Sequence, residues 1–164
     1  MADSAPSRLG ADLALTRYTG TAGGPALVEA DSWGSLDLRV VPGGRGGLVQ
    51  AIEPRDLGAV AGRANLAQAI ILRLLTPRGA LAGLAHPAYG SRLTRLVGGP
   101  NRVTTRNLAR LYTLEALREE PRVEKVLGLT VSPVPGQPDT LRLELSVQPI
   151  DDSEPLTLSL DLDL

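Results

Sequence analysis

The strict alternation of apolar and polar residues near the C-terminus constrains the fold more than any other feature. From Leu141 to Val147 and from Leu156 to Leu164, every second residue is Leu or Val, and the residues between are polar. A period of two places the apolar side chains on one face of a sheet and the polar ones on the other. Together with a preceding strand over Val123–Val131, these segments predict an antiparallel sheet that needs helices over its apolar face.

Two segments have the spacing of such helices. Asn65 is a suitable N-cap for a buried helix that ends near Leu75. Thr104 or Thr105 is a suitable cap for a longer helix that stops at Glu120, before a proline. Its expected apolar stripe consists of Leu108, Leu111, Tyr112, Leu114 and Leu117. A short helix over 92–97 is expected between them.

The N-terminal part has a different composition. Residues 1–34 are rich in Gly, Ala, Ser and Thr without a sustained period, so we expect irregular structure there. Ser35–Val41 and Leu48–Ile52 flank a glycine-rich loop and predict a short β-hairpin. The expected organisation is an N-terminal extension over 1–61 and an α+β domain over 62–164, with helices packed on one face of a small antiparallel C-terminal sheet.

Composition excludes several kinds of site. The chain has no cysteine and one histidine, His86, so a disulfide framework, a thiolate metal site and a histidine cluster are all excluded. No window approaches the length of an apolar membrane span. We expect a cytoplasmic protein with no metal, no cofactor and no direct membrane insertion.

Charge is divided along the chain. Residues 73–122 hold nine arginines against three glutamates, a balance of +6, whereas residues 123–164 hold eight acids against Lys125 and Arg142, a balance of −6. Two interpretations remain open: surfaces that dock unlike neighbours, or solvated faces. Nucleic acid is not the expected partner, because only Tyr89 and Tyr112 are interleaved with the arginines and the net charge is −1.

Glu115 and Glu119 are the candidate catalytic pair. Their i, i+4 spacing places them on one helix face, where they could supply the two carboxyl groups that glycoside hydrolysis uses. They stand among Arg110, Arg118 and Arg122 in a region expected to be exposed. Nothing there would raise a carboxyl pKa towards neutrality, so we predict solvated ion pairs and no catalytic residue.

The segment from 75 to 93 joins the two helices through repeated turn residues. Its repeated Pro and Gly residues predict a rigid connector, in which His86 caps a turn or forms a hydrogen bond within it. The structural turn residues are Thr76, Pro77, Gly79, His86, Pro87, Tyr89 and Gly90.

Two features are candidates for binding another chain. Glu-Pro-Arg occurs at 53–55 and at 120–122, and the second copy, Glu120, Pro121 and Arg122, stands where the long helix meets the sheet. The planar guanidinium of Arg122 could donate hydrogen bonds to a carboxylate or carbonyl, inside the domain or across an interface. The last strand is expected near a sheet edge, where backbone around Leu158, Leu160 and Leu162 would pair with a partner.

These motifs, in this order, resemble a known family. A Thr-Pro-x-Gly turn, a Pro-x-Tyr-Gly turn and Glu-Pro-Arg after a long helix are similar to the baseplate wedge protein of contractile-tailed phages, gene product twenty-five. That family has relatives in type VI secretion (TssE) and in extracellular contractile injection systems. The resemblance covers about 62–164, and NLAQAIILRLL with HPAYGSRL is most like the extracellular branch. Ala80 departs from the family, whose members commonly carry an acid there.

The resemblance implies a non-enzymatic structural subunit. It implies six copies per baseplate that link the wedge core bundle to the sheath and start sheath assembly, with Glu120, Pro121 and Arg122 contacting the bundle. The implied partners are large wedge subunits, the sheath subunit, and tube or spike proteins. Two alternatives remain open: a peptidoglycan hydrolase of a tail baseplate, and a regulatory adaptor with the same fold.

Overall fold

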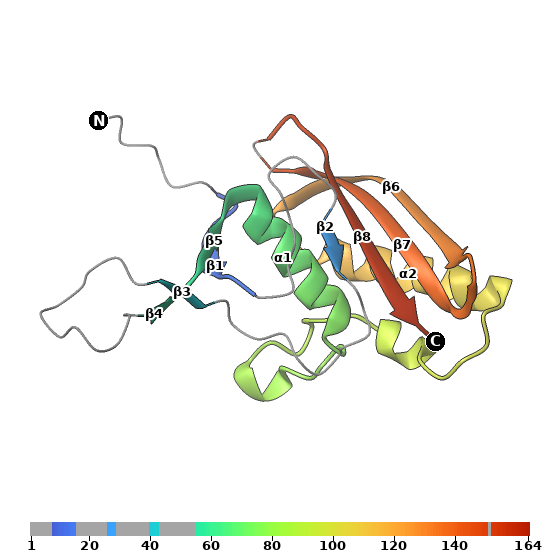
Figure 1. The fold of residues 1–164 in the computed structure, drawn as a ribbon. Helices are drawn as coiled ribbons and strands as arrows, with labels where there is room; N and C mark the ends of the chain where they lie inside the picture. Colours follow the sequence, from blue (N-terminus) through green and yellow to red (C-terminus); the bar gives the residue numbers. More distant parts are fainter. Residues whose placement is uncertain (1–7, 16–25, 29–39, 43–54, 151) are drawn as a thin grey trace, which may run out of the picture.

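The computed structural model describes residues 8–15, 26–28, 40–42, 55–150 and 152–164. Within them the fold is α+β, as predicted, and its centre is a four-stranded sheet with the order β2-β8-β7-β6 (Figure 1). The long strands are β6 (Val123–Val134), β7 (Gln137–Pro149) and β8 (Leu156–Asp163), and β7 pairs antiparallel with both of the others. The short strand β2 (Ala26–Val28) pairs parallel with β8 on its outer side.

The predicted alternation is confirmed residue by residue. Leu143 lies opposite Leu160 and Leu145 opposite Leu158, and all four side chains are at most 3% exposed. Across the same strands Arg142 and Asp161 form a bidentate ion pair on the polar face, with N–O distances of 2.8 and 2.6 Å. One face of the sheet therefore builds the core, and the other carries polar groups.

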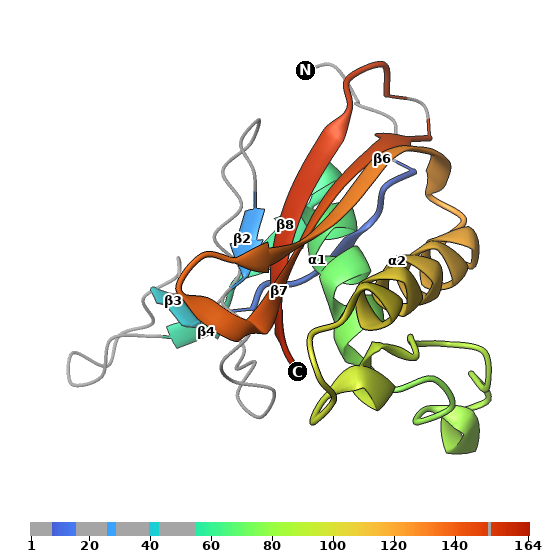
Figure 2. The same ribbon diagram turned by 90° about the vertical axis from the view of Figure 1, so that its right-hand side faces the viewer.

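Both main helices cover the apolar face, α1 (Gly62–Leu75) against β8 and α2 (Val103–Arg118) against β6 (Figure 2). The leucines of the sheet and the buried residues of the two helices form one continuous core cluster. No helix in the described part of the chain is long and apolar enough to cross a membrane.

Helix α1 begins earlier than predicted. Ala61 is the N-cap, and Asn65 is 4% exposed inside the helix, where its amide donates to the Leu9 carbonyl at 2.9 Å. Gln68 similarly bonds both Leu13 and Leu15. Two polar side chains of α1 thus hold the segment from 8 to 15 against the helix, and Leu9 belongs to the core.

The apolar stripe predicted for helix α2 is confirmed except at Leu111. The buried residues of the helix are Ala109, Thr113, Ala116 and Leu117, whereas Leu111 is 48% exposed. The other members of the predicted stripe, Leu108, Tyr112 and Leu114, are partly buried and pack against the core. The helix starts at Val103 with Arg102 as N-cap and stops two residues before Glu120. The predicted short helix is a 3₁₀ turn, η2 (Leu93–Leu96), and a second such turn, η1, spans Ala82–Leu84.

The N-terminal residues form short antiparallel pairs. Strand β1 (Ala11–Leu13) pairs with β5 (Ala59–Ala61), and β3 (Val40–Pro42) pairs with β4 (Arg55–Leu57). The expectation of irregular structure over 1–34 is wrong for the two strands in that range, β1 and β2. The predicted strand Leu48–Ile52 and the glycine loop lie outside the described residues.

Candidate functional site

The connector between the helices is closed on itself by backbone hydrogen bonds. Ser91 N donates to Thr76 O at 2.8 Å, and Arg78 N donates to Ser91 O at 2.7 Å. The Ser91 hydroxyl donates to Leu74 O at 2.6 Å, which ties the end of the connector to the last turn of α1. The two ends of the connector are therefore fixed side by side.

Gly90 makes this closure possible. Its φ is 101°, and a Cβ at this position would lie 2.5 Å from the Thr76 carbonyl oxygen. Only glycine combines that backbone conformation with such a close approach. The chain can then pass directly beside Thr76 and Pro77.

The other predicted turn residues shape the outer part of the connector. Gly79 N donates to Tyr89 O at 3.2 Å, and Tyr89 N donates to His86 O at 3.2 Å. The side chains of His86 and Pro87 are exposed. Among the residues that the structure describes, no group of three or more His, Cys, Asp or Glu side chains is arranged to hold a metal ion.

Glu120 is the centre of a buried ion cluster, which we name the Glu120 cluster: Arg73, Tyr89, Glu120 and Arg122. Glu120 is only 3% exposed. Its Oε1 accepts from Arg122 Nε at 2.6 Å, and its Oε2 pairs with Arg73 Nη2 at 3.3 Å. Burial alone would raise the pKa of the Glu120 carboxyl. The hydrogen bonds from Arg122 and the charges of Arg122 and Arg73 outweigh that effect and hold the pKa below its usual value.

The cluster joins four segments of the chain. Arg73 comes from α1, and its guanidinium lies 4.5 Å from the ring centre of Tyr89 in the connector, within the range of a cation–π contact. Burial raises the pKa of Tyr89, which favours the neutral phenol. Arg122 also donates through Nη1 to Leu9 O at 3.2 Å, so helix, connector, sheet and N-terminal segment meet here.

The structure places the second Glu-Pro-Arg motif at the junction of α2 and β6, where the sequence predicted it. Arg122 reaches both a carboxylate and a carbonyl inside the domain, while its side chain remains 25% exposed and Pro121 is exposed. Glu120 and Arg122 are thus engaged within the chain. That this motif binds a partner stays a prediction.

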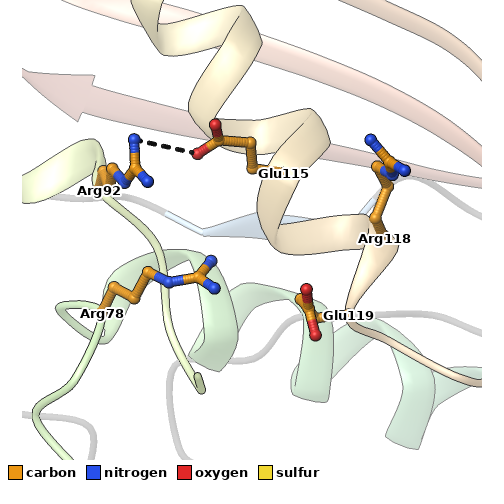
Figure 3. Close-up of a pocket in the computed structure, with 5 residues that line it drawn as sticks. All are labelled: Arg78, Arg92, Glu115, Arg118 and Glu119. Carbon is orange, nitrogen blue, oxygen red and sulfur yellow. Dashed lines mark ion pairs between the residues drawn. The ribbon is translucent and has the colours of Figure 1, made fainter. Parts of the chain in front are cut away.

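A second charged site lies beside the first, and we name it the arginine pocket: Arg78, Arg92, Glu115, Arg118 and Glu119. These five side chains line an open cavity of about 400 Å³. Figure 3 shows Arg78 and Arg92 extending from the connector towards the end of α2, from which the other three project. Three guanidinium groups and two carboxylates give the lining a formal charge of +1.

Few charges in the arginine pocket are paired. Arg92 Nη1 lies 3.6 Å from Glu115 Oε2 (Figure 3), too far for a hydrogen bond. This oxygen is buried and has no hydrogen-bond partner among the described residues. Arg78 and Arg118 are exposed, and the side chain of neither makes an ion pair or hydrogen bond in the described part of the chain.

The partner contact predicted at β8 stays a prediction, and the structure shows where the strand is already occupied. Leu158, Leu160 and Leu162 are each at most 3% exposed, so their side chains belong to the core. β8 is also not the outer strand along its first half, because β2 pairs with residues 158–160. The alternation correctly predicted the burial of these leucines. The short pairing segment at 26–28 carried no signal that would have placed it.

Sequence reasoning missed three participants in the two sites. The sequence places Arg73, Arg78 and Arg92 in a basic region but does not indicate their roles, because those roles depend on how the connector folds back. The available signal was the spacing of arginines around the turn residues. This spacing indicates a high density of positive charge, but it does not show which carboxylate pairs with each arginine.

Comparison with known proteins identifies a similar fold. No protein-family model matches the sequence, and no curated protein matches it significantly. Among solved structures, a proposed tail lysozyme from Geobacter sulfurreducens is similar with a TM-score of 0.52 and 24% sequence identity. The match covers 60% of this chain and 86% of the other. It shows a shared fold.

Proposed function

We propose that the protein is a structural baseplate subunit of a contractile injection particle, equivalent to the wedge protein that joins the wedge core bundle to the sheath. The main support for this proposal is the structural similarity to a protein described as a tail lysozyme. The domain over 62–164 holds the Thr-Pro-x-Gly, Pro-x-Tyr-Gly and Glu-Pro-Arg motifs in the order of the wedge family.

The geometry supports a role in rigid assembly. The Glu120 cluster ties the connector, both main layers and the N-terminal segment together at one point. A rigid subunit of this kind would keep the neighbours that bind it at fixed positions relative to one another. In this proposal the protein assembles in the cytoplasm, six copies surround a tube, and large wedge subunits and the sheath subunit are the direct neighbours.

Co-expression tests the proposal. We expect the tagged protein to co-purify with the large wedge subunits encoded beside it, as a complex of fixed stoichiometry by native mass spectrometry. Arg122→Ala is expected to lose this complex, because the exposed part of its guanidinium would face the partner. The variant also loses its bond to the buried Glu120, so circular dichroism must show that it is folded at the temperature of the assay. Arg110→Ala, an exposed arginine on α2, serves as the control. Normal sheathed particles from the Arg122→Ala variant would contradict the role of the motif.

A specific observation supports a peptidoglycan hydrolase as the second candidate. Glu115 and Glu119 line one cavity, and the similar structure carries a lysozyme name. The ion pair of Glu115 with Arg92 and the two further guanidinium groups favour a role in binding over one in proton transfer. We therefore expect no clearing of a peptidoglycan suspension by the purified protein. Clearing that disappears in Glu115→Gln or Glu119→Gln would establish the enzyme.

A further inference from the structure

We propose that the arginine pocket is a docking site for an acidic segment of a protein partner, held through the carboxylates of its aspartate or glutamate side chains. The identity of that partner as a baseplate subunit rests on the proposed function. The binding chemistry rests on the pocket itself.

The pocket is built from separate parts of the chain that are fixed relative to one another. Arg78 and Arg92 lie at opposite ends of the connector, and Arg118 is the last residue of α2. The backbone hydrogen bonds between Arg78, Ser91 and Thr76 hold the two connector arginines near each other before any ligand arrives. A preformed site loses less conformational entropy when it binds.

The charges of the pocket lack partners, in contrast to those of the Glu120 cluster. Arg78 and Arg118 have no ion pair or side-chain hydrogen bond in the described residues. Arg92 has a 3.6 Å ion pair with Glu115 and a cation–π contact with Tyr112 at 5.7 Å from the ring centre. Like charges held close together repel, and a carboxylate placed between guanidinium groups relieves that repulsion. The arginine fork also fits a carboxylate through two parallel hydrogen bonds.

The charge balance of the lining favours an acidic peptide over a dense polyanion. The two glutamates reduce the formal charge of the lining to +1, which is too little for a dense polyanion such as nucleic acid. The Oε2 of Glu115 is buried and already lies 3.6 Å from Arg92, so a ligand would contact the guanidinium groups and not this oxygen. All five lining residues are charged and the lining surface is mainly polar, which disfavours a hydrophobic ligand.

The surrounding charge would also steer such a partner. The region from 73 to 122 carries a balance of +6, and its arginines extend beyond the pocket. An acidic segment is attracted from a distance and then fixed at the pocket, and this attraction weakens as ionic strength rises.

A peptide titration tests the site. The probe is the synthetic peptide acetyl-Ala-Glu-Ala-Glu-Ala-Glu-amide, added to ¹⁵N-labelled protein at low ionic strength while arginine Nε–Hε signals are followed by NMR. We expect the signals of Arg78, Arg92 and Arg118 to shift. The double variant Arg78→Gln/Arg118→Gln is expected to weaken binding at least tenfold.

A matched variant and a second probe make the result decisive. Arg95→Gln/Arg110→Gln removes the same charge from exposed arginines outside the pocket, and it is expected to change the affinity less than threefold. Equal loss in both double variants would overturn the site, because general attraction would then explain the binding. Inorganic phosphate that shifts the same signals at the same concentration would overturn the preference for a peptide carboxylate.

A co-expression experiment separates this inference from the proposed function. If wild-type protein captures the large wedge subunits and Arg78→Gln/Arg118→Gln does not, both proposals are supported. If the two proteins capture them equally, the docking site is wrong and the baseplate role stands. If wild-type protein captures no wedge subunit while the acidic peptide binds the pocket, the baseplate role is wrong and the peptide site stands.

Discussion

The Glu120 cluster and the arginine pocket lie next to each other at the end of α2 and use the same two residue types in opposite ways. In the cluster, one carboxylate at 3% exposure is held by two guanidinium groups within 3.3 Å. In the pocket, three guanidinium groups and two carboxylates share an open cavity, with one ion pair at 3.6 Å. The first site is closed around a paired carboxylate, although Arg73 Nε has no hydrogen-bond partner among the described residues, and the second is open and incompletely paired.

The two sites show how neighbouring residues can have separate roles, one in stability and one in binding. Glu119 and Glu120 are adjacent in sequence just after α2, but Glu120 is buried and paired with Arg73 and Arg122, whereas Glu119 is exposed and lines the arginine pocket. A buried carboxylate must be paired within the fold, and so Glu120 stabilises it. Exposed and incompletely paired arginines add little to stability and are available to another molecule.

The largest expected effect is on stability and follows from Glu120→Ala. The change leaves Arg73, whose side chain is 10% exposed, and the partly buried Arg122 without their carboxylate. Removing one member of a buried pair costs about 3–5 kcal/mol. We expect a decrease of that size in the free energy of unfolding by urea denaturation.

Glu119→Ala is the control for this comparison. Glu119 is exposed and its side chain makes no hydrogen bond or ion pair in the described residues, so the change is expected to cost less than about 0.5 kcal/mol. Similar losses for the two variants would show that the cluster is not the stabilising element.

Gly90→Ala is expected to disturb both sites together. The new Cβ would lie 2.5 Å from Thr76 O, and the φ of 101° is strained for alanine, so the closure of the connector must shift. We expect a loss of about 1–3 kcal/mol in the free energy of unfolding. In Gly98→Ala the φ is 81° with no atom within 4 Å, which isolates the backbone strain. Equal costs at the two positions would exclude a steric role for Gly90.

Much of the fold was predictable because it depends on local patterns. A period of two in β7 and β8 needs no knowledge of the rest of the chain, and the register that pairs Leu143 with Leu160 follows from burying one face. The cap at Asn65 was predicted wrongly because a long-range bond to Leu9 O overrides its local preference. The pairing of β2 with β8 had no pattern of its own.

The sites were less predictable because they are built from distant residues. Glu-Pro-Arg marked the helix–sheet junction, and Arg122 does reach a carboxylate and a carbonyl there. Arg73 lies 47 residues from Glu120, and no local pattern pairs them. The position of Arg78 relative to Arg92 depends on a connector that closes through backbone bonds, which leave little trace in side-chain identity.

A moderate effect of pH distinguishes the two sites. Because the pKa of Glu120 is lower in the folded protein than its usual 4.5, its stabilising contribution is complete above that value and is lost as pH falls through the folded pKa. We expect unfolding free energy to fall more steeply on acidification in wild-type protein than in Glu120→Gln. The variant is needed for reference because the pKa of Asp152 is also lowered, first by its hydrogen bond from Glu154 N and then by Arg63. Parallel pH profiles for the two proteins would show that Glu120 does not contribute.

The smallest expected effect is on the stability of the isolated protein when the arginine pocket is changed. Arg78→Gln/Arg118→Gln removes two exposed guanidinium groups that have no ion pairs in the described residues, so unfolding free energy is expected to change by less than about 0.5 kcal/mol. Removal of like charges relieves repulsion, so any change should be a gain at low ionic strength that disappears near 1 M salt. Urea denaturation at the two salt concentrations measures it. A loss above 1 kcal/mol would mean that the pocket helps to hold the fold, and the distinction between a structural and a binding cluster would then fail.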